Sequence, residues 1–369
     1  MKTTLMLAGA LLLAALPLLG EGTAGDNGKF RRFFSWGAPV NEEVARKYAE
    51  AGVTDITVHN PRQCELALKY GMRPYWKVFL PEGPWRQKMT PDEEAYSAYI
   101  SGRDLDPKLP KAERRKILDR RRIEKQHRYG GEAVTDPDVL GERDIRCFIS
   151  DTDFALSAKK LDELVGNAPK ESCGIFLDYI GYMNQRGCYC ESCLSKYRAY
   201  LKARNLADTQ SARDGFYREQ LELYYNKVID RIKKLRPDYK VVVHVYPDFR
   251  ADHLPGNRFR ADCCGQTVAW YFQWPSEKIA KYTKYVVEHA KDRYPEAEGV
   301  PFLGLNADPT SSLGYKSPAD VERELQVILA AGGRSLMVCS GHCIIKPGYF
   351  EVFRKYCGKS KPEPATGQN

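Results

Sequence analysis

The sequence predicts a (β/α)8 barrel, an α/β fold of eight parallel strands that alternate with helices, with a long insertion after the third strand. Eight short apolar runs recur along the chain, and segments with helical periodicity lie between them. Strands that alternate with helices imply a parallel sheet, and eight is the number that closes this barrel. The predicted strands are residues 33–36, 53–59, 73–79, 174–178, 240–246, 267–272, 300–306 and 335–339.

Turn and capping residues delimit the predicted helices. Asn41 begins a helix that ends before Gly52, and Ser317-Pro318 begins another that ends before Gly332. Between the strands, apolar residues at helical spacing mark further helices in 154–165, 221–235 and 279–286.

The two ends of the chain predict segments outside the barrel. Lys2, an apolar run over 5–19 and small residues up to Ala24 are typical of a cleaved signal peptide, residues 1–24. We therefore expect a secreted or periplasmic protein. No later run approaches the roughly 20 apolar residues of a membrane span, so it should not be membrane-embedded. Residues 25–358 then form one barrel domain with an insertion over 81–146, and 359–369 form a disordered tail.

The net charge of +9 is concentrated in one segment of the insertion. Residues 111–128 hold nine Lys and Arg against three Asp and Glu, while the rest of the chain is nearly balanced. Because the basicity is local, nucleic-acid binding is not expected. Two interpretations remain open: a solvated charged helix, or a lid that attracts an anionic substrate such as a sulfated or uronate-containing glycan.

Polar and aromatic residues gather where the predicted strands end. Barrel active sites are built at this face, and flat aromatic rings suit the stacking of sugar rings. Each residue taken alone is also compatible with a packing role in the core. The predicted substrate-binding residues are Trp36, His59, Lys77, Tyr182, His244, Tyr246, Tyr271, Gln273, Trp274, Asn306 and His342.

Asp178 ends the apolar strand 174–178 and is the leading candidate for a catalytic carboxylate. Hydrolysis of a glycosidic bond requires two carboxyl groups, one to attack or to activate water and one to protonate the leaving oxygen. Asp308 and Asp248 are the candidates for the second role, although Asp308 could equally cap a turn. No Glu stands at any predicted strand end.

Cys188, Cys190 and Cys193 lie within six residues of one another. Their spacing suits a tetrahedral structural zinc, with Cys147 as the expected fourth ligand and Cys173, at the far end of its strand, as the runner-up. Disulfides among the same residues are the alternative, because an exported protein meets an oxidising environment. Cys339 and Cys343 are a further candidate pair. No organic cofactor is expected.

The segment around Asp178 resembles known sugar-cleaving barrels. Gly174-Ile-Phe-Leu-Asp178 and the Cys-Tyr-Cys-x-x-Cys knuckle at 188–193 are similar to the strand-four region of glycoside hydrolase family forty-two beta-galactosidases. They resemble more closely the hypothetical glycosyl hydrolases related to those enzymes and to alpha-L-fucosidases. The resemblance covers 147–201 and implies a barrel fold, a sugar ligand and zinc at the knuckle.

One departure from the galactosidase pattern concerns the catalytic position. That pattern has Asn-Glu at strand four, whereas this chain has Leu177-Asp178. The difference favours a fucosidase-like arrangement with Asp178 as the nucleophile, or an inactive relative.

Three functions follow as hypotheses. The first is a secreted glycoside hydrolase that degrades a polysaccharide by carboxylate-mediated hydrolysis. The second is a non-catalytic carbohydrate-binding protein on a degenerate barrel. The third, a metal-dependent hydrolase using His59, His244 and His342, is disfavoured because strand one ends in Ser35-Trp36 rather than a His-x-His pair.

Overall fold

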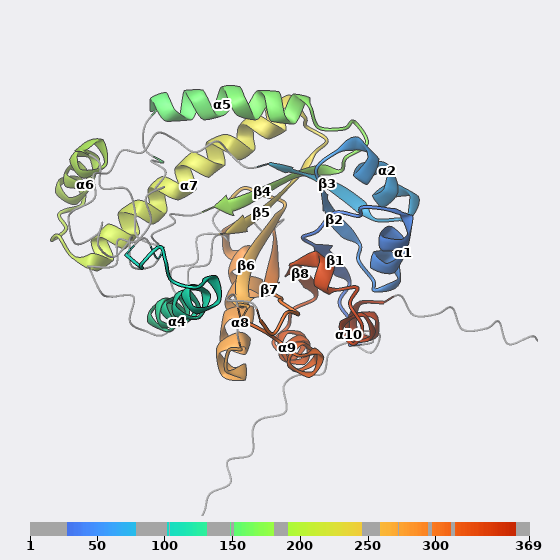
Figure 1. Cartoon of the computed structure of the whole chain (residues 1–369). Helices are drawn as coiled ribbons and strands as arrows, with labels where there is room; N and C mark the ends of the chain where they lie inside the picture. Colours follow the sequence, from blue (N-terminus) through green and yellow to red (C-terminus); the bar gives the residue numbers. More distant parts are fainter. Residues whose placement is uncertain are drawn as a thin grey trace, which may run out of the picture.

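The chain folds into a closed barrel of eight parallel strands in sequential order (Figure 1). The computed structural model describes residues 28–78, 102, 104–130, 148, 151–180, 191–245, 259–271, 273–293, 297–310 and 314–358. The strands are β1 (Arg32–Ser35), β2 (Asp55–Val58), β3 (Arg73–Val78), β4 (Gly174–Ile180), β5 (Lys240–Val245), β6 (Cys263–Ala269), β7 (Glu298–Gly304) and β8 (Ser335–Cys339). β1 pairs with β8, which closes the sheet and confirms the predicted (β/α)8 barrel.

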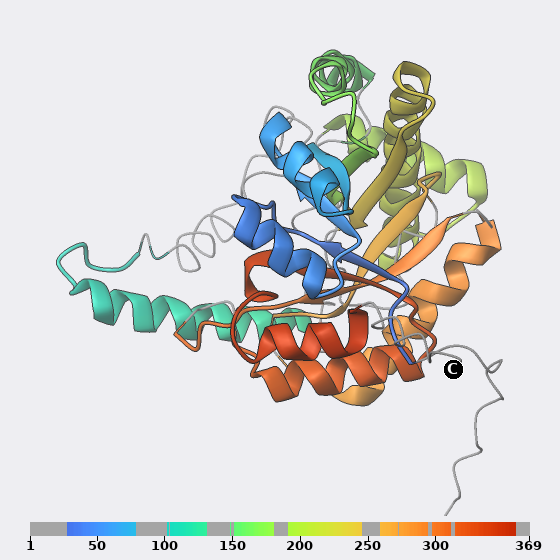
Figure 2. The ribbon, with the colours of Figure 1, turned by 90° about the vertical axis from the view of Figure 1, so that its right-hand side faces the viewer.

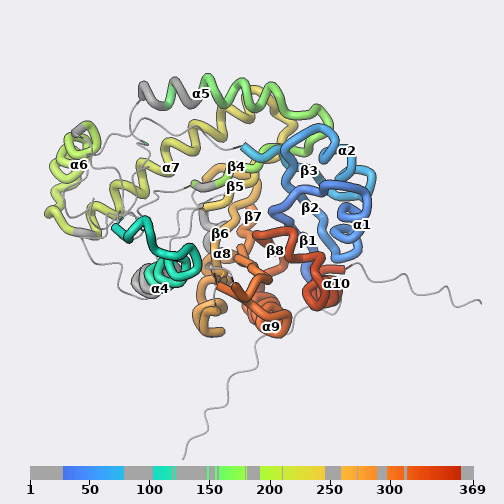
Figure 3. The backbone as a smooth tube through the Cα atoms, in the orientation of Figure 1, coloured from blue at the N-terminus to red at the C-terminus, as the bar shows by residue number. Residues whose placement is uncertain are grey.

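Helices alternate with the strands, and most of them cover the outside of the barrel, as the tube in Figure 3 shows. They are α1 (Glu42–Glu50), α2 (Pro61–Lys69), α4 (Lys111–Gly130), α5 (Asp151–Gly166), α6 (Glu191–Arg204), α7 (Gln210–Leu235), α8 (Ser276–Arg293), α9 (Pro318–Ala330) and α10 (Tyr349–Cys357). The predicted caps are present: the Asn41 side chain accepts from the Val44 amide, and Ser317 and Asp320 form a capping box. α4 belongs to the long insertion between β3 and β4.

β6 begins four residues earlier than the sequence indicated. The apolar run predicted a strand over 267–272, but β6 starts at Cys263 and ends at Ala269. The segment Cys263-Cys264-Gly265-Gln266 has little apolar pattern, yet it pairs with both β5 and β7. Gly265 fits there because a Cβ atom would lie only 2.8 Å from the Met337 side chain. Tertiary pairing therefore overrides local pattern at this strand.

The barrel is filled by side chains from its alternating inward positions. This interior cluster consists of Phe34, Tyr75, Phe176, Val242, Cys263, Val300, Phe302 and Met337. Two larger apolar clusters separate the outer face of the sheet from the surrounding helices. The barrel is thus a packed core, and its two ends are where polar side chains can collect.

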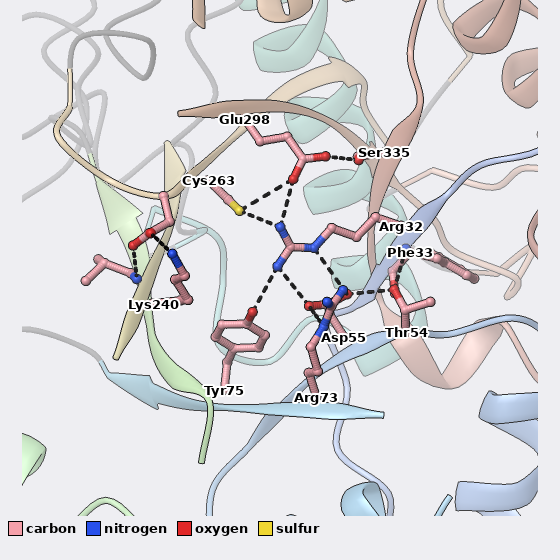
Figure 4. A network of polar contacts seen from close by, with 12 residues as sticks. Arg32, Phe33, Thr54, Asp55, Arg73, Tyr75, Lys240, Cys263, Glu298 and Ser335 are labelled. Carbon is pink, nitrogen blue, oxygen red and sulfur yellow. Dashed lines mark hydrogen bonds and ion pairs between the residues drawn. The ribbon is translucent and has the colours of Figure 1, made fainter. Parts of the chain in front are cut away.

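A network of charged groups occupies the end where the strands begin (Figure 4). Asp55 is fully buried and accepts hydrogen bonds from Arg32 at 2.9 and 3.3 Å and from Arg73 at 2.7 and 3.0 Å. Arg32 also donates to the Tyr75 hydroxyl at 2.9 Å and to Glu298 at 2.7 Å. These bonds join β1, β2, β3 and β7, so the network ties the strands together at the base of the barrel.

Several expectations fall on residues that the structure does not describe. The signal peptide, the tail over 359–369, and Cys147, Cys188, Cys190, Tyr182, Tyr246 and Asp248 lie outside the described residues. Of the helices that are described, none is long and apolar enough to cross a membrane.

Candidate active site

Asp178 lies at the opposite end of the barrel, where the strands finish. Its carboxylate is fully buried between the side chains of two neighbouring strands. Lys77 of β3 places its Nζ 3.0 Å from Asp178 Oδ2, and His244 of β5 places its Nδ1 3.3 Å from Asp178 Oδ1. Because β3, β4 and β5 are adjacent in the sheet, the inward-facing side chains Lys77, Asp178 and His244 form one cluster of titratable groups. The sequence predicted all three residues, and the structure brings them together.

Aromatic rings surround this cluster. The Trp36 ring lies 4.8 Å from the His244 ring, and the Lys77 ammonium sits 4.2 Å from the centre of the Trp36 ring. The Phe302 ring also packs against His244, with the ring centroids 4.2 Å apart. An ammonium over a tryptophan face is an attractive cation–π contact, and the packing limits the rotamers of both side chains. The cluster is therefore held in a defined geometry before any ligand binds.

His244 offers one nitrogen for further bonding. When Nδ1–H donates to Asp178, the neutral ring carries a lone pair on Nε2. Nε2 is buried and has no hydrogen-bond partner among the described residues. A buried acceptor without a partner is costly, and such atoms are typical of sites that receive a ligand or a water molecule.

His59 lies at the edge of the same site. It follows β2 directly and is exposed. Although the residue is exposed overall, desolvation by the protein atoms around the ring lowers its pKa, the positive charge of Lys77 lowers it further, and Asp178 opposes the change. The imidazole therefore stands within electrostatic reach of both Lys77 and Asp178.

Asp308, one candidate for the second carboxylate, is engaged in a turn. Its Oδ1 accepts hydrogen bonds from the Thr310 amide at 2.8 Å and the Thr310 hydroxyl at 2.7 Å, and its own amide donates to Asn306 at 3.1 Å. The bonds from Thr310, together with Arg115 and Lys346, hold the pKa of Asp308 below its usual value. A general acid must carry a proton at the working pH, so this environment suits a base or a turn cap better than an acid.

Other predicted residues occupy separate parts of the rim. The Tyr271 hydroxyl donates to the Cys339 thiol at 2.9 Å, and burial raises the pKa of Cys339 to about 11. Trp274 packs 5.5 Å from Tyr282 in the core beneath α8, away from the barrel interior. Gln273 is exposed. The Asn306 amide group donates to the Gly314 carbonyl at 3.0 Å, so that side chain stabilises its own loop.

The expected pair of Cys339 and Cys343 is wrong. Both are free thiols. Cys339 Sγ accepts from Tyr271, while Cys343 Sγ lies 3.5 Å from Nε2 of His342 in the short 3-10 helix Gly341–Cys343. The two sulfur atoms thus have different partners.

Two metal sites were considered, one formed by three histidines and one formed by cysteines, and the described residues bear only on the first. No group of three or more His, Cys, Asp or Glu side chains that could hold a metal ion is found in the described part of the chain, which counts against His59, His244 and His342 as metal ligands. Cys193 is buried near the start of α6, but its three expected partners lie outside the described residues.

Two aromatic members of the site were not singled out from the sequence. Phe176 and Phe302 pack against Trp36, each with a ring centroid 5.7 Å away. Period-two alternation along β4 and β7 could have found them, because Phe176 stands two residues before Asp178 and Phe302 two residues before Gly304.

The fold and the position of this cluster define a (β/α)8 barrel with its candidate site at the carboxyl ends of the strands, and the solved structures that it resembles include glycoside hydrolases. The glycoside hydrolase domain of PgaB (BpsB) from Bordetella bronchiseptica superimposes with a TM-score of 0.55 at 9% sequence identity, over 89% of this chain and 99% of that domain.

More distant likenesses are to beta-galactosidases. The enzyme from Halorubrum lacusprofundi matches with a TM-score of 0.47 at 14% identity, over 83% of this chain and 52% of that one. Gan42B, a GH42 beta-galactosidase, matches with a TM-score of 0.47 at 11% identity, over 85% of this chain and 51% of that one. The chain thus spans about half the length of these enzymes. No protein-family model matches the sequence, and no curated protein matches it.

Proposed function

We propose that the protein is a secreted glycoside hydrolase in which Asp178 is the nucleophile or general base. The observation that carries the proposal is the buried Asp178–Lys77–His244 cluster at the carboxyl end of the barrel. Buried charges at this face are typical of active sites, because carboxylates there can act on a ligand held by the βα loops. The glycoside hydrolase neighbours support a carbohydrate as the substrate.

The cluster supplies part of the required chemistry. Glycoside hydrolysis needs a carboxylate that attacks the anomeric carbon or activates water, and Asp178 is already oriented by Lys77 and His244. Trp36, His59, Tyr271 and His342 would line the sugar pocket. The second carboxyl group is assigned to Asp248 or Asp308, and Asp308 would have to leave its turn hydrogen bonds to Thr310 in order to carry a proton.

Two further features belong to the same proposal. Residues 1–24 would be removed on export. The knuckle Cys188, Cys190 and Cys193, together with Cys147, would hold a structural zinc that fixes the loop after β4, as in the galactosidase- and fucosidase-related barrels that the sequence resembles.

The test is a screen of the purified protein against neutral and acidic polysaccharides, read out by the release of reducing sugar. We expect Asp178→Asn to abolish cleavage of any glycan that the natural protein cleaves. Asp238→Asn, an exposed aspartate just before β5, is the matched control and should keep full activity. Cleavage that survives in Asp178→Asn would overturn the assignment. Glycan binding without product release by the natural protein would instead support a carbohydrate-binding barrel.

A further inference from the structure

α4 brings a dense group of positive charges into the structure. Lys111–Gly130 contains nine Lys and Arg against three Asp and Glu. Charged helices are often simply solvated. Whether the cations of α4 could bind a ligand therefore depends on where the helix lies and on whether its cations form ion pairs within the protein.

The helix is attached to the rim of the barrel. Arg115 of α4 donates from Nη2 to the Thr310 carbonyl at 3.1 Å. Thr310 belongs to the loop after β7, on the face where Asp178 lies. Figures 1 and 2 show α4, in teal, beside this region and extending beyond the barrel. α4 is therefore attached to the end of the barrel at which Asp178 lies.

One side of α4 is used to hold its own segment. Arg121 forms two hydrogen bonds to Asp104 at 2.7 and 3.0 Å, and Arg114 donates to the Gly102 carbonyl at 2.9 Å. Leu118 packs so closely against Gly102 that a Cβ atom there would lie 2.6 Å from it. These contacts fix which side of the helix faces its own segment and which faces away.

The outward side presents cations that have no internal partner. Lys116 and Arg120 are one helical turn apart and therefore share a face. Both are exposed, and neither forms an ion pair within the described residues. Across the rim, Lys346 follows β8 and acts with Arg115 on Asp308, whose own oxygen is bonded to Thr310. Positive charge thus lies on both sides of the loop after β7.

We propose, on the basis of the glycosidase function proposed above, that the substrate is an acidic glycan whose carboxylate or sulfate groups bind Lys116 and Arg120 on α4. Solvated cations attract a polyanion through many weak contacts, and such attraction raises the local concentration of substrate near the mouth. A neutral glycan would gain nothing from this helix.

The experiment compares binding of heparin and polygalacturonate, as sulfated and uronate probes, with binding of a neutral glucan to the full mature protein by titration calorimetry. The double variant Lys116→Glu/Arg120→Glu should weaken binding of the acidic probes by about five- to tenfold and leave the neutral glucan unaffected. Added salt should reduce the same binding. Lys281→Glu/Lys284→Glu, which makes an equal charge change on exposed residues of α8, is the matched control and should bind as the natural protein does.

Several outcomes would overturn this inference. Equal weakening by both double variants would show that only the overall charge matters, and tighter binding of a single-stranded DNA oligomer than of either acidic glycan would point to a general polyanion surface. Cleavage of neutral glycans without any preference for acidic ones would remove the inference and leave the glycosidase proposal intact. If the folded protein neither binds nor cleaves any glycan, both proposals fail.

Discussion

The two ends of the barrel each bury an aspartate, but they hold it in different ways. Asp55, where the strands begin, receives four hydrogen bonds from two guanidinium groups. Asp178, where the strands end, has an equally buried carboxylate, and its partners among the described residues include one ammonium and one imidazole. A guanidinium group can donate two parallel hydrogen bonds to the two oxygens of a carboxylate, which fixes the orientation of the carboxylate. An ammonium is a point charge that imposes less geometry, and an imidazole can exchange a proton. The comparison teaches that partner chemistry, rather than burial, separates a structural carboxylate from a candidate catalytic one.

The largest effect on stability is expected at the base of the barrel. Asp55→Asn removes the charge that compensates Arg32 and should lower the free energy of unfolding by about 3–5 kcal/mol. Asp178→Asn should cost clearly less, since Lys77 keeps its cation–π contact with the Trp36 ring. Chemical denaturation followed by circular dichroism measures both values. Equal losses would remove the distinction between the two ends.

A second buried ion pair, near the carboxyl ends of the strands, tests whether buried charges at that end of the barrel can also have a purely structural role. Lys316 and Glu324 are both fully buried and lie 2.7 Å apart, and Lys316 also donates to the Gly304 carbonyl at the end of β7. Burial lowers the pKa of Lys316 and raises that of Glu324. Lys316→Met should therefore cost about 3 kcal/mol of unfolding free energy by leaving Glu324 unpaired. Lys316→Met/Glu324→Leu should recover most of this loss, and a double variant as unstable as the single one would contradict the pairing argument.

The sequence predicts most elements of the fold, but less of the geometry of the site. The eight strands and the capped helices at Asn41 and Ser317 follow from local pattern, because each element carries its own signal. The start of β6 at Cys263 does not, since that segment is defined by pairing with β5 and β7.

The residues of the site, like β6, are only partly predicted by local sequence pattern. Asp178, Lys77 and His244 stand at strand ends and can be listed from the sequence, but their pairing depends on the closure of the barrel. The inward direction of Phe302, and the burial of Trp274 beneath α8, depend on register and packing that single residues do not reveal.

A smaller effect is expected from His244, which touches Asp178 but is not proposed to attack the substrate. His244→Asn removes the imidazole beside Asp178, and we expect the variant to fold and its kcat/KM on the cleaved glycan to fall by about ten- to a hundredfold. Thermal unfolding of the variant serves as the control for folding. Full activity in His244→Asn would show that the imidazole is not needed to position the carboxylate.

The smallest effect concerns pH and His59. Its pKa is lowered in the folded protein, so below its unfolded value of about 6.5 the unfolded state binds more protons. Stability should therefore fall as the pH drops from 7 towards 5, and His59→Gln should flatten part of that fall. Melting temperatures measured across this range provide the test. An unchanged slope in His59→Gln would show that other groups account for the dependence.

The most direct test of the account is the value of kcat/KM per folded molecule for Asp178→Asn beside that for Asp55→Asn, on the same glycan. We predict that Asp178→Asn is folded and loses at least about a thousandfold, as expected for removal of a catalytic carboxylate. Asp55→Asn should be less stable but should retain near-natural activity at a temperature where it is folded. An active Asp178→Asn, or an Asp55→Asn that is folded yet equally inactive, would contradict the claim that the catalytic carboxylate lies at the carboxyl end of the barrel.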